Sequence, residues 1–228
     1  VVDDLNIVLG VITVDDIVDV VIEEASEDML KLSGTSGEDI QSNKLIEGGI
    51  WYALVHRLPW LGVTLVGGII ASYIMIIFSK ALNQSNIHLS LVLSFVPLLM
   101  GLAGNVGNQS ATILVRAFAI NDVNLKRRWV IILREVLIGS SIGILIGIIV
   151  GSYVWMTTGN EIFAMSILLA ILLNMTIAVL FGAGLPVIFK QINIDPAVAS
   201  APFISTALDI IGQIIYYIIV IMLLNVMI

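Results

Sequence analysis

The sequence predicts an all-α integral membrane protein with five transmembrane helices per subunit. The second span is expected to be broken or kinked, and a cytoplasmic, acidic, amphipathic helix precedes the first. The 228 residues are 59% hydrophobic and 12% charged, whereas a soluble domain carries about 25% charged residues. Five apolar stretches are each long enough to cross a bilayer, which takes about 20 residues. The net charge of −7 divides into −9 for residues 1–60 (twelve acids, three bases) and +2 for the remainder (five acids, seven bases).

This composition excludes several classes of protein. No basic stripe is present, so nucleic acid is not an expected partner. The chain has no cysteine, which excludes disulfides, thiolate metal sites and thiol nucleophiles. Residues 1–10 are not a signal peptide, because acids stand where a basic region should be. With no nucleophile–base pair, phosphate loop or histidine-containing metal motif, an enzyme is not predicted.

Residues 1–14 are expected to be the end of a cytoplasmic domain, and residues 15–50 an acidic connecting helix with a linker. The pattern of residues 8–16 is that of a strand end running into a helix, with Thr13 as N-cap and Asp16 completing a capping box. Asp16 is therefore interpreted first as a cap.

Six carboxylates follow one another on this helix without an interleaved base until Lys31. They are Asp16, Asp19, Glu23, Glu24, Glu27 and Asp28. Like charges three or four residues apart repel one another. The run is either a solvated helix face or a site for a hard divalent cation, which would relieve the repulsion.

Residues 51–228 form the predicted five-span membrane domain, and the odd number of spans places the two termini on opposite faces. The spans are expected at Leu61–Ser79, Leu89–Ala119, Trp129–Met156, Ile162–Phe189 and Phe203–Leu224. With the amino terminus in the cytoplasm, most bases of this domain lie inside, as the positive-inside rule requires. These bases are Arg57, Arg116, Lys126, Arg127, Arg128, Arg134 and Lys190. The protein is therefore expected to be a multi-pass protein of the cell (inner) membrane, with its carboxyl terminus outside the cytoplasm.

Two spans have unusual sequences. The second has 31 residues, which would reach about 46 Å as a straight helix against a hydrocarbon core of about 30 Å. Pro97 and three glycines within it predict a break or kink. The third span has glycine at every fourth position (Gly139, Gly143, Gly147 and Gly151), which is typical of close helix packing.

Asp209 is the only Asp, Glu, Lys, Arg or His between Pro196 and Ile228, and it lies within the last span. An aspartate in a membrane span is costly and marks an ion path or proton relay by default. The alternative is a structural aspartate bonded to a neighbouring helix. Ser205 and Gly212 lie near the same helix face, so hydroxyl and carbonyl oxygens are expected beside it.

Other polar residues within the spans allow more than one interpretation. Glu135 near the start of the third span is either an interfacial ion-pairing group or a pore residue. Asn174 is expected to form an interhelical hydrogen bond. A polar patch in the second span either lines water or locks helices together; it comprises Asn105, Asn108, Gln109, Ser110 and Thr112.

These residues resemble those of the MgtE family of magnesium channels and transporters over essentially the whole chain. The most specific match is Gly104-Asn105-Val106-Gly107-Asn108-Gln109-Ser110-Ala111-Thr112, which resembles the family's second-span signature. It is supported by residues 57–61 before the first span, Asp195-Pro196-Ala197 before the last, and Asp209. Ala103 and Ala201 depart from residues often found in the family. The first 14 residues resemble the end of a CBS domain, so the chain is expected to be truncated.

The resemblance implies a homodimer in the lipid bilayer with a Mg²⁺ pore on its two-fold axis, and Mg²⁺ as both substrate and regulator. Asp209 from each subunit would face a largely hydrated ion, with Ser205 nearby, and Glu135 would match a family acid of the membrane region. The regulatory Mg²⁺ ligands would be Asp16, Asp19, Glu24, Glu27, Asp28 and Asp195. Two alternatives to such a channel are an ion-coupled divalent-cation exchanger and a Mg²⁺ sensor or anchor that does not conduct.

Overall fold

The computed structural model describes the chain except for residues 2–3, 36–41, 48, 83–88, 120–127 and 226–228. In chain order the elements are α1 (Val14–Leu32), α2 (Ser42–Glu47), α3 (Ile50–Leu82), α4 (Leu89–Ser94), α5 (Val96–Ala119), α6 (Arg128–Thr158), α7 (Glu161–Gln191), the 3-10 helix η2 (Pro196–Val198) and α8 (Ala201–Asn225). The described residues include no β-strand, and the all-α class is confirmed. Of the expected strand end, the described residues show one bridge residue, Val8.

Among the described residues, five helical segments are long and apolar enough to cross a membrane, as predicted. Their apolar segments are Ile50–Lys80, Leu89–Ala119, Trp129–Thr158, Glu161–Gln191 and Ala201–Leu223. The first begins well before the expected Leu61, because the helix continues through the polar residues His56 and Arg57. Residues 83–88, between the first two expected spans, and 120–127, which join the second to the third and include the bases Lys126 and Arg127, lie outside the described residues.

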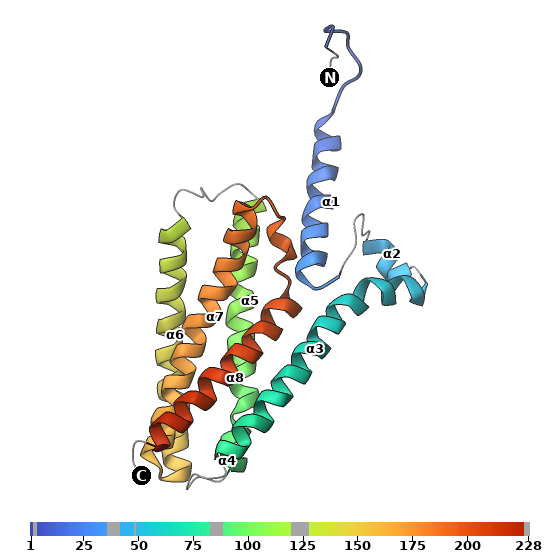
Figure 1. Ribbon diagram of the computed structural model, residues 1–228. Helices are drawn as coiled ribbons and strands as arrows, with labels where there is room; N and C mark the ends of the chain where they lie inside the picture. Colours follow the sequence, from blue (N-terminus) through green and yellow to red (C-terminus); the bar gives the residue numbers. More distant parts are fainter. Residues whose placement is uncertain (2–3, 36–41, 48, 83–88, 120–127, 226–228) are drawn as a thin grey trace.

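α1 is a capped helix that stands beside one end of the bundle (Figure 1). The predicted capping box is present: the Asp16 N–H donates to Thr13 Oγ1 at 3.4 Å, and the Thr13 N–H donates to Asp16 Oδ2 at 2.8 Å. The helix ends before Gly34, whose φ of +80° suits a glycine C-cap. A Cβ on Gly34 would overlap the ring of Pro202, so the end of α1 rests directly on the first turn of α8.

The second span is broken, as the sequence predicts. α4 ends at Ser94 and α5 begins at Val96, and the span bends by 26°. Pro97 causes this break, since it has no N–H to donate and its ring clashes with the carbonyl four residues earlier. The Phe95 N–H turns back to the Val92 carbonyl oxygen at 3.4 Å.

The core of the bundle lies around α7, which packs against α5, α6 and α8. Large buried residues at its centre include Phe163, Ile171 and Met175 from α7 and Tyr216 from α8. The predicted glycine ridge on α6 packs on α7: a Cβ at Gly139 would overlap Val179, and one at Gly143 would lie 3.0 Å from the Leu172 Cα. The ridge is therefore a packing surface.

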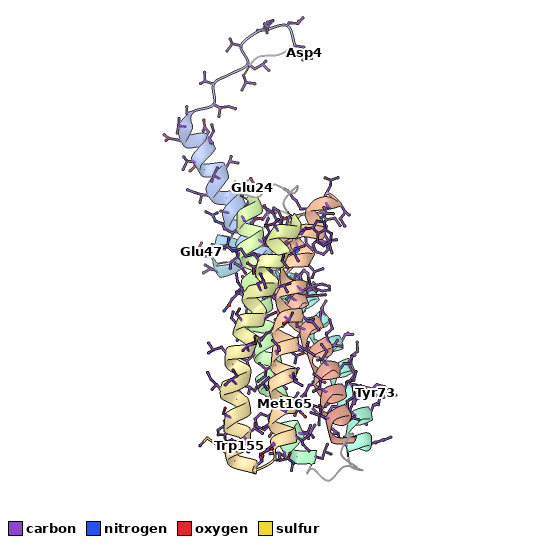
Figure 2. The ribbon with its side chains drawn as sticks, turned by 90° about the vertical axis from the view of Figure 1, so that its left-hand side faces the viewer. Asp4, Glu24, Glu47, Tyr73, Trp155 and Met165 are labelled. Carbon is purple, nitrogen blue, oxygen red and sulfur yellow. The ribbon has the colours of Figure 1, made fainter. Side chains whose placement is uncertain are left out.

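The outer faces of α3 and α6 are apolar and exposed, as lipid contact requires. They carry Leu65, Val66 and Ile69 on α3, and Leu133, Leu137 and Leu145 on α6. Figure 1 shows α3 and α8 crossing the bundle obliquely, with α8 ending at the opposite end from α1. Figure 2 places Glu24 at the α1 end and Trp155 at the other.

Candidate cation-binding sites

The first candidate site is the contact between α5 and α8 within the membrane domain. These helices run in opposite directions and are joined by two hydrogen bonds between side chains. The Asn108 Nδ2 atom donates to Ser205 Oγ at 2.9 Å, and the Gln213 Nε2 atom contacts Met100 Sδ at 3.3 Å. Asp209 lies one helical turn from Ser205 and one from Gln213. Its carboxylate is therefore held level with the stretch of α5 between Met100 and Asn108.

The same stretch of α5 presents polar groups on an open face. Asn105, Gln109 and Thr112 are exposed, and Asn108 is half-buried. Gly101 is exposed as well, and a Cβ built on it would meet no atom within 4 Å. Exposed amides within a membrane span are costly unless they face water or another protein surface. This face of α5, beside Asp209, is therefore unsuited to lipid.

Glu135 lies on a different side of α5 from Asp209. It accepts a hydrogen bond from the buried Ser110 Oγ to its Oε2 at 2.8 Å. Ser110 is two residues after Asn108, so the two side chains point to nearly opposite sides of the helix. The structure thus separates Glu135 from Asp209 within one subunit, and Glu135 links α5 to α6.

Asn174 forms an interhelical hydrogen bond, as predicted. Its Nδ2 atom donates to the Gly212 carbonyl oxygen at 3.4 Å, and its side chain packs on the Gly212 backbone. Asn174 is buried on α7, so the bond fixes α7 against α8 one turn beyond Asp209.

The second candidate site is a pocket of about 660 Å³ at the α1 end of the bundle. One wall is α1, which contributes Glu23, Glu24, Glu27, Asp28 and Lys31. The opposite wall comprises the ends of α5 and α7 with η2, which contribute Arg116, Lys190, Asp195 and Pro196 among others. The pocket therefore brings four of the predicted α1 acids together with Asp195, which is far from them in sequence.

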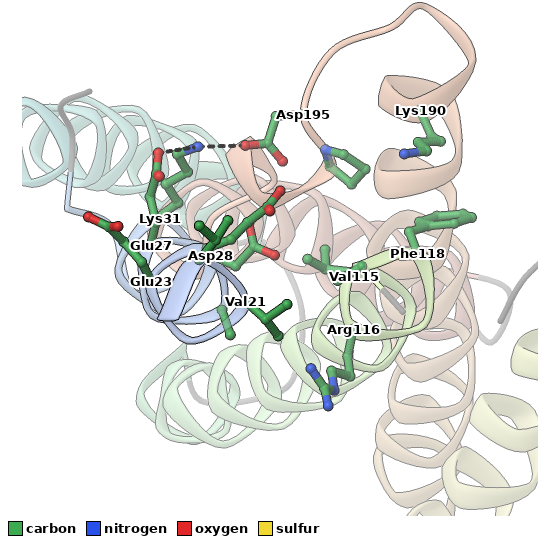
Figure 3. Close-up of a pocket in the computed structure, with 15 residues that line it drawn as sticks. Val21, Glu23, Glu27, Asp28, Lys31, Val115, Arg116, Phe118, Lys190 and Asp195 are labelled. Carbon is green, nitrogen blue, oxygen red and sulfur yellow. Dashed lines mark hydrogen bonds and ion pairs between the residues drawn. The ribbon is translucent and has the colours of Figure 1, made fainter. Parts of the chain in front are cut away.

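Asp195 is positioned by the short helix that follows it. Its Oδ1 atom accepts the Ala197 N–H at 2.9 Å, so it caps η2. Its Oδ2 atom accepts from Lys31 Nζ at 2.7 Å, and Lys31 Nζ also lies 2.8 Å from Glu27 Oε1. Figure 3 shows Lys31 between the two carboxylates, with Lys190 across the pocket.

The electrostatics of these groups follow from their contacts. Partial burial raises the pKa of Asp195, but the hydrogen bonds from Lys31 and the Ala197 N–H outweigh it and lower the pKa overall. Partial burial lowers the pKa of Lys31, and its bonds to Asp195 and Glu27 outweigh this and raise the pKa. The pKa of Asp28 is raised by partial burial and then by the charge of Asp195. The positive charge of Lys31 thus does not offset the burial of the Asp28 carboxylate and its repulsion by Asp195.

Asp16 and Asp19 do not line this pocket. Asp16 is occupied by the capping box, where the hydrogen bonds from Thr13 lower its pKa. Asp19 is exposed on α1, two turns nearer the amino terminus than Glu27.

Neither site is a complete metal cage on its own. Among the residues that the structure describes, no three histidine, aspartate or glutamate side chains converge closely enough to hold a metal ion. The chemistry of the donors still fits Mg²⁺, which keeps several waters and is bound through one or two carboxylates. Asp209 offers one carboxylate per subunit, and the pocket offers Glu24, Glu27, Asp28 and Asp195.

Two features of these sites are not predicted from the sequence. The contact of Lys31 with Asp195 joins residues 164 positions apart, so no local sequence pattern indicates it. Only the ion pair of Lys31 with Glu27 has a local pattern, the i,i+4 spacing on one helix. Arg116 and Lys190 enter the pocket because α5 and α7 both end beside α1, which depends on the packing of the whole bundle.

Comparison with known proteins identifies one family that the chain resembles. Residues 96–219 match the family model MgtE, described as a divalent cation transporter. The chain is 34% identical to the magnesium transporter MgtE of Bacillus subtilis over 221 residues, which cover 95% of this chain and 46% of the relative. It is 31% identical to the magnesium transporter MgtE of Thermus thermophilus over 217 residues (95% and 46%) and 34% identical to that of Enterococcus faecalis over 209 residues (92% and 44%). The chain thus spans somewhat less than half the length of these relatives.

Proposed function

This chain belongs to the MgtE family, and on that premise we propose that it forms the conducting part of a Mg²⁺ channel. Mg²⁺ is the substrate and passes between two copies of the chain at Asp209. Cytosolic Mg²⁺ closes the path by binding the acids of α1 and Asp195. The family model describes transporters, in agreement with the sequence prediction that the chain is not an enzyme.

The observation that carries the proposal is the open polar face of α5 beside Asp209. Asn105 and Gln109 are exposed there, near the middle of the membrane span Leu89–Ala119. A second copy of the chain facing this surface would remove the amides from lipid and enclose a hydrated path. It would also supply a second Asp209, and two carboxylates with retained waters are what Mg²⁺ prefers.

The direction of transport follows from the proposed orientation with α1 in the cytoplasm. At 100 mV, inside negative, a divalent ion gains about 4.6 kcal/mol on crossing inward, since each charge contributes about 2.3 kcal/mol. Passive conduction would therefore fill the cell with Mg²⁺, and a means of closure that responds to cytosolic Mg²⁺ is needed. The pocket between α1 and η2 lies at the corresponding end of the bundle.

The acids of that pocket fit the role of a cation sensor. Glu24, Glu27 and Asp28 on α1 face Asp195 on the α7–α8 connection. Mg²⁺ held between the two walls would neutralise carboxylates on both and draw α1 onto the membrane domain. Asp28 would gain most, because burial and the charge of Asp195 already disfavour its ionised form.

The proposal is tested by Mg²⁺ flux into liposomes that carry a Mg²⁺-sensitive dye and an imposed membrane potential. We expect Asp209→Asn to abolish flux while circular dichroism and gel filtration match the wild type. Glu161→Gln is the matched control, since it neutralises an exposed acid at the far end of the bundle and should conduct normally. Full flux through Asp209→Asn would overturn the assignment.

The same liposomes separate a channel from an ion-coupled exchanger. A channel conducts Mg²⁺ under potential alone, with equal pH and equal Na⁺ on both sides. Flux that appears only with a proton or Na⁺ gradient would assign Asp209 to coupled exchange instead. A chain that binds Mg²⁺ but shows no flux under any gradient would be a sensor rather than a channel.

A further inference from the structure

We propose that Lys31 is a built-in cation that docks α1 onto the membrane domain without metal, by occupying the space between Glu27 and Asp195 that a bridging divalent ion would otherwise fill. The competition with Mg²⁺ rests on the function proposed above. The docking contact itself does not depend on that function.

The geometry of Lys31 is that of a bridge between two separate parts of the fold. Its ammonium group lies 2.8 Å from Glu27 Oε1 on its own helix and 2.7 Å from Asp195 Oδ2 at the start of η2. A lysine ammonium has three donors and one positive charge, so it can satisfy both carboxylates at once. No other salt bridge joins α1 to the membrane domain among the described residues.

A neighbouring contact holds the same end of α1 as Lys31. Gly34 ends α1 and lies against the ring of Pro202 at the start of α8. Lys31 is three residues earlier, so the ion pair and the glycine contact hold the same end of the helix. The amino-terminal half of α1 is exposed and extends away from the bundle (Figure 1).

The other two cations of the pocket do not make this bridge. Lys190 and Arg116 line the opposite wall, and neither forms a salt bridge with an acid of α1 in the described part of the chain. Lys190 acts on Asp195 only through its charge at a distance. It therefore serves as a matched comparison: the same charge in the same pocket, without the contacts.

This arrangement has a consequence for regulation. When Mg²⁺ binds between Glu27 and Asp195, the ammonium group of Lys31 must leave, so the lysine opposes the first step of metal binding. Without Lys31, Glu27 and Asp195 have no ammonium group between them, and docking of α1 depends more strongly on an added cation. Lys31 thus sets how strongly docking depends on Mg²⁺.

The experiment measures the distance between α1 and the end of α7 by double electron–electron resonance in lipid nanodiscs. Spin labels are placed at Met29→Cys and Gln191→Cys, two exposed positions that do not line the pocket. The chain contains no cysteine, so only these two sites are labelled. Samples are compared in EDTA and in a series of Mg²⁺ concentrations.

With Lys31 unchanged, we expect a minor docked population in EDTA that grows as Mg²⁺ is added. Lys31→Met should lower the docking equilibrium constant about two- to fivefold, as suits partly exposed ion pairs, and Mg²⁺ should then restore the short distance. Lys31→Arg should dock without metal, and Lys190→Met should behave like the unsubstituted chain. An unchanged distance distribution for Lys31→Met in EDTA would overturn the proposal, as would an undocked helix in every sample without metal.

The outcomes also separate this inference from the proposed function. If Lys31→Met undocks in EDTA but Mg²⁺ does not restore docking, the lysine bridge stands and the regulatory Mg²⁺ site is wrong. If Mg²⁺ docks all variants alike and EDTA undocks them alike, the Mg²⁺ site stands and the lysine bridge is wrong.

Discussion

Asn108 on α5 donates a hydrogen bond to Ser205 on α8 across 2.9 Å, one helical turn from Asp209. The Oδ1 atom of the same amide is buried without a hydrogen-bond partner among the described residues. The bond therefore sets the register of α5 against α8, and the second polar atom of the amide is left buried near the proposed ion path.

A double-mutant cycle tests whether this bond couples the two helices. Asn108→Ala and Ser205→Ala should each lower thermal stability in detergent and Mg²⁺ flux, and the double variant should cost less than the sum of the two. We expect a coupling free energy of about 0.5–1.5 kcal/mol, the usual range for one hydrogen bond. Strictly additive losses in stability would show that the two side chains do not act as a pair.

The close backbone contact between α5 and α7 leads us to a second prediction. A Cβ on Gly182 would overlap the carbonyl oxygen of Gly107, whereas a Cβ on Gly184 would meet no atom within 4 Å. We expect Gly182→Ala to destabilise the protein by about 1–3 kcal/mol, as overpacking does. Gly184→Ala, on the same helix, should leave stability nearly unchanged. Thermal unfolding followed by the fluorescence of the four tryptophans would measure both, and equal melting temperatures would contradict the contact.

The fold was largely predictable because each signal for it is local in sequence. The apolar spans follow from hydropathy and length, the break at Phe95 from Pro97, and the start of α1 from Thr13 and Asp16. The beginning of α3 at Ile50 was missed, because a helix that continues out of the bilayer through Arg57 carries no apolar signal there. Hydropathy marks the membrane, whereas the helix ends where its backbone hydrogen bonds end.

The candidate sites were predictable in residue type but not in grouping. Asp209 and the acids of α1 stand out because carboxylates in such surroundings are costly. Helices that are distant in sequence must pack together before Lys31 can pair with Asp195. The same is true of Glu135, which lies on the side of α5 that faces α6. A side chain two positions along a helix faces almost the opposite way, so small differences in helix rotation decide which polar groups meet.

The raised pKa of Asp28 predicts how metal-free docking of α1 depends on pH. Burial and the charge of Asp195 raise this pKa above 3.8, so the protonated form favours docking, and that contribution is lost as the pH rises through the raised pKa. Docking in EDTA should therefore strengthen as the pH falls from 7 towards 4. Asp28→Asn should dock more firmly at pH 7 and lose this dependence.

Spin-label distances between positions 29 and 191 measure this effect. The titration of Asp195 does not overlap with this effect. Its pKa is lowered below 3.8, so its contribution to docking is lost only in more acidic solution. If Asp28→Asn keeps the full pH dependence of the wild type, the titrating group in this range is a different one.

Neutralising the pocket acids of α1 together separates regulation from conduction. The variant Glu24→Gln, Glu27→Gln, Asp28→Asn removes three carboxylates from the wall that faces Asp195 and leaves Asp209 untouched. Because Mg²⁺ then has few ligands with which to bridge α1 to the membrane domain, the Mg²⁺ concentration that inhibits flux should rise at least about tenfold, the equivalent of 1.4 kcal/mol in binding. The maximal flux at low Mg²⁺ on the α1 side should match that of the wild type.

A control with the same loss of charge uses exposed acids outside the pocket, Asp4→Asn, Asp15→Asn and Glu47→Gln, and should keep wild-type inhibition. If the pocket variant instead stops conducting, these acids belong to the ion path itself; if the control weakens inhibition equally, the effect is one of net charge and not of a site.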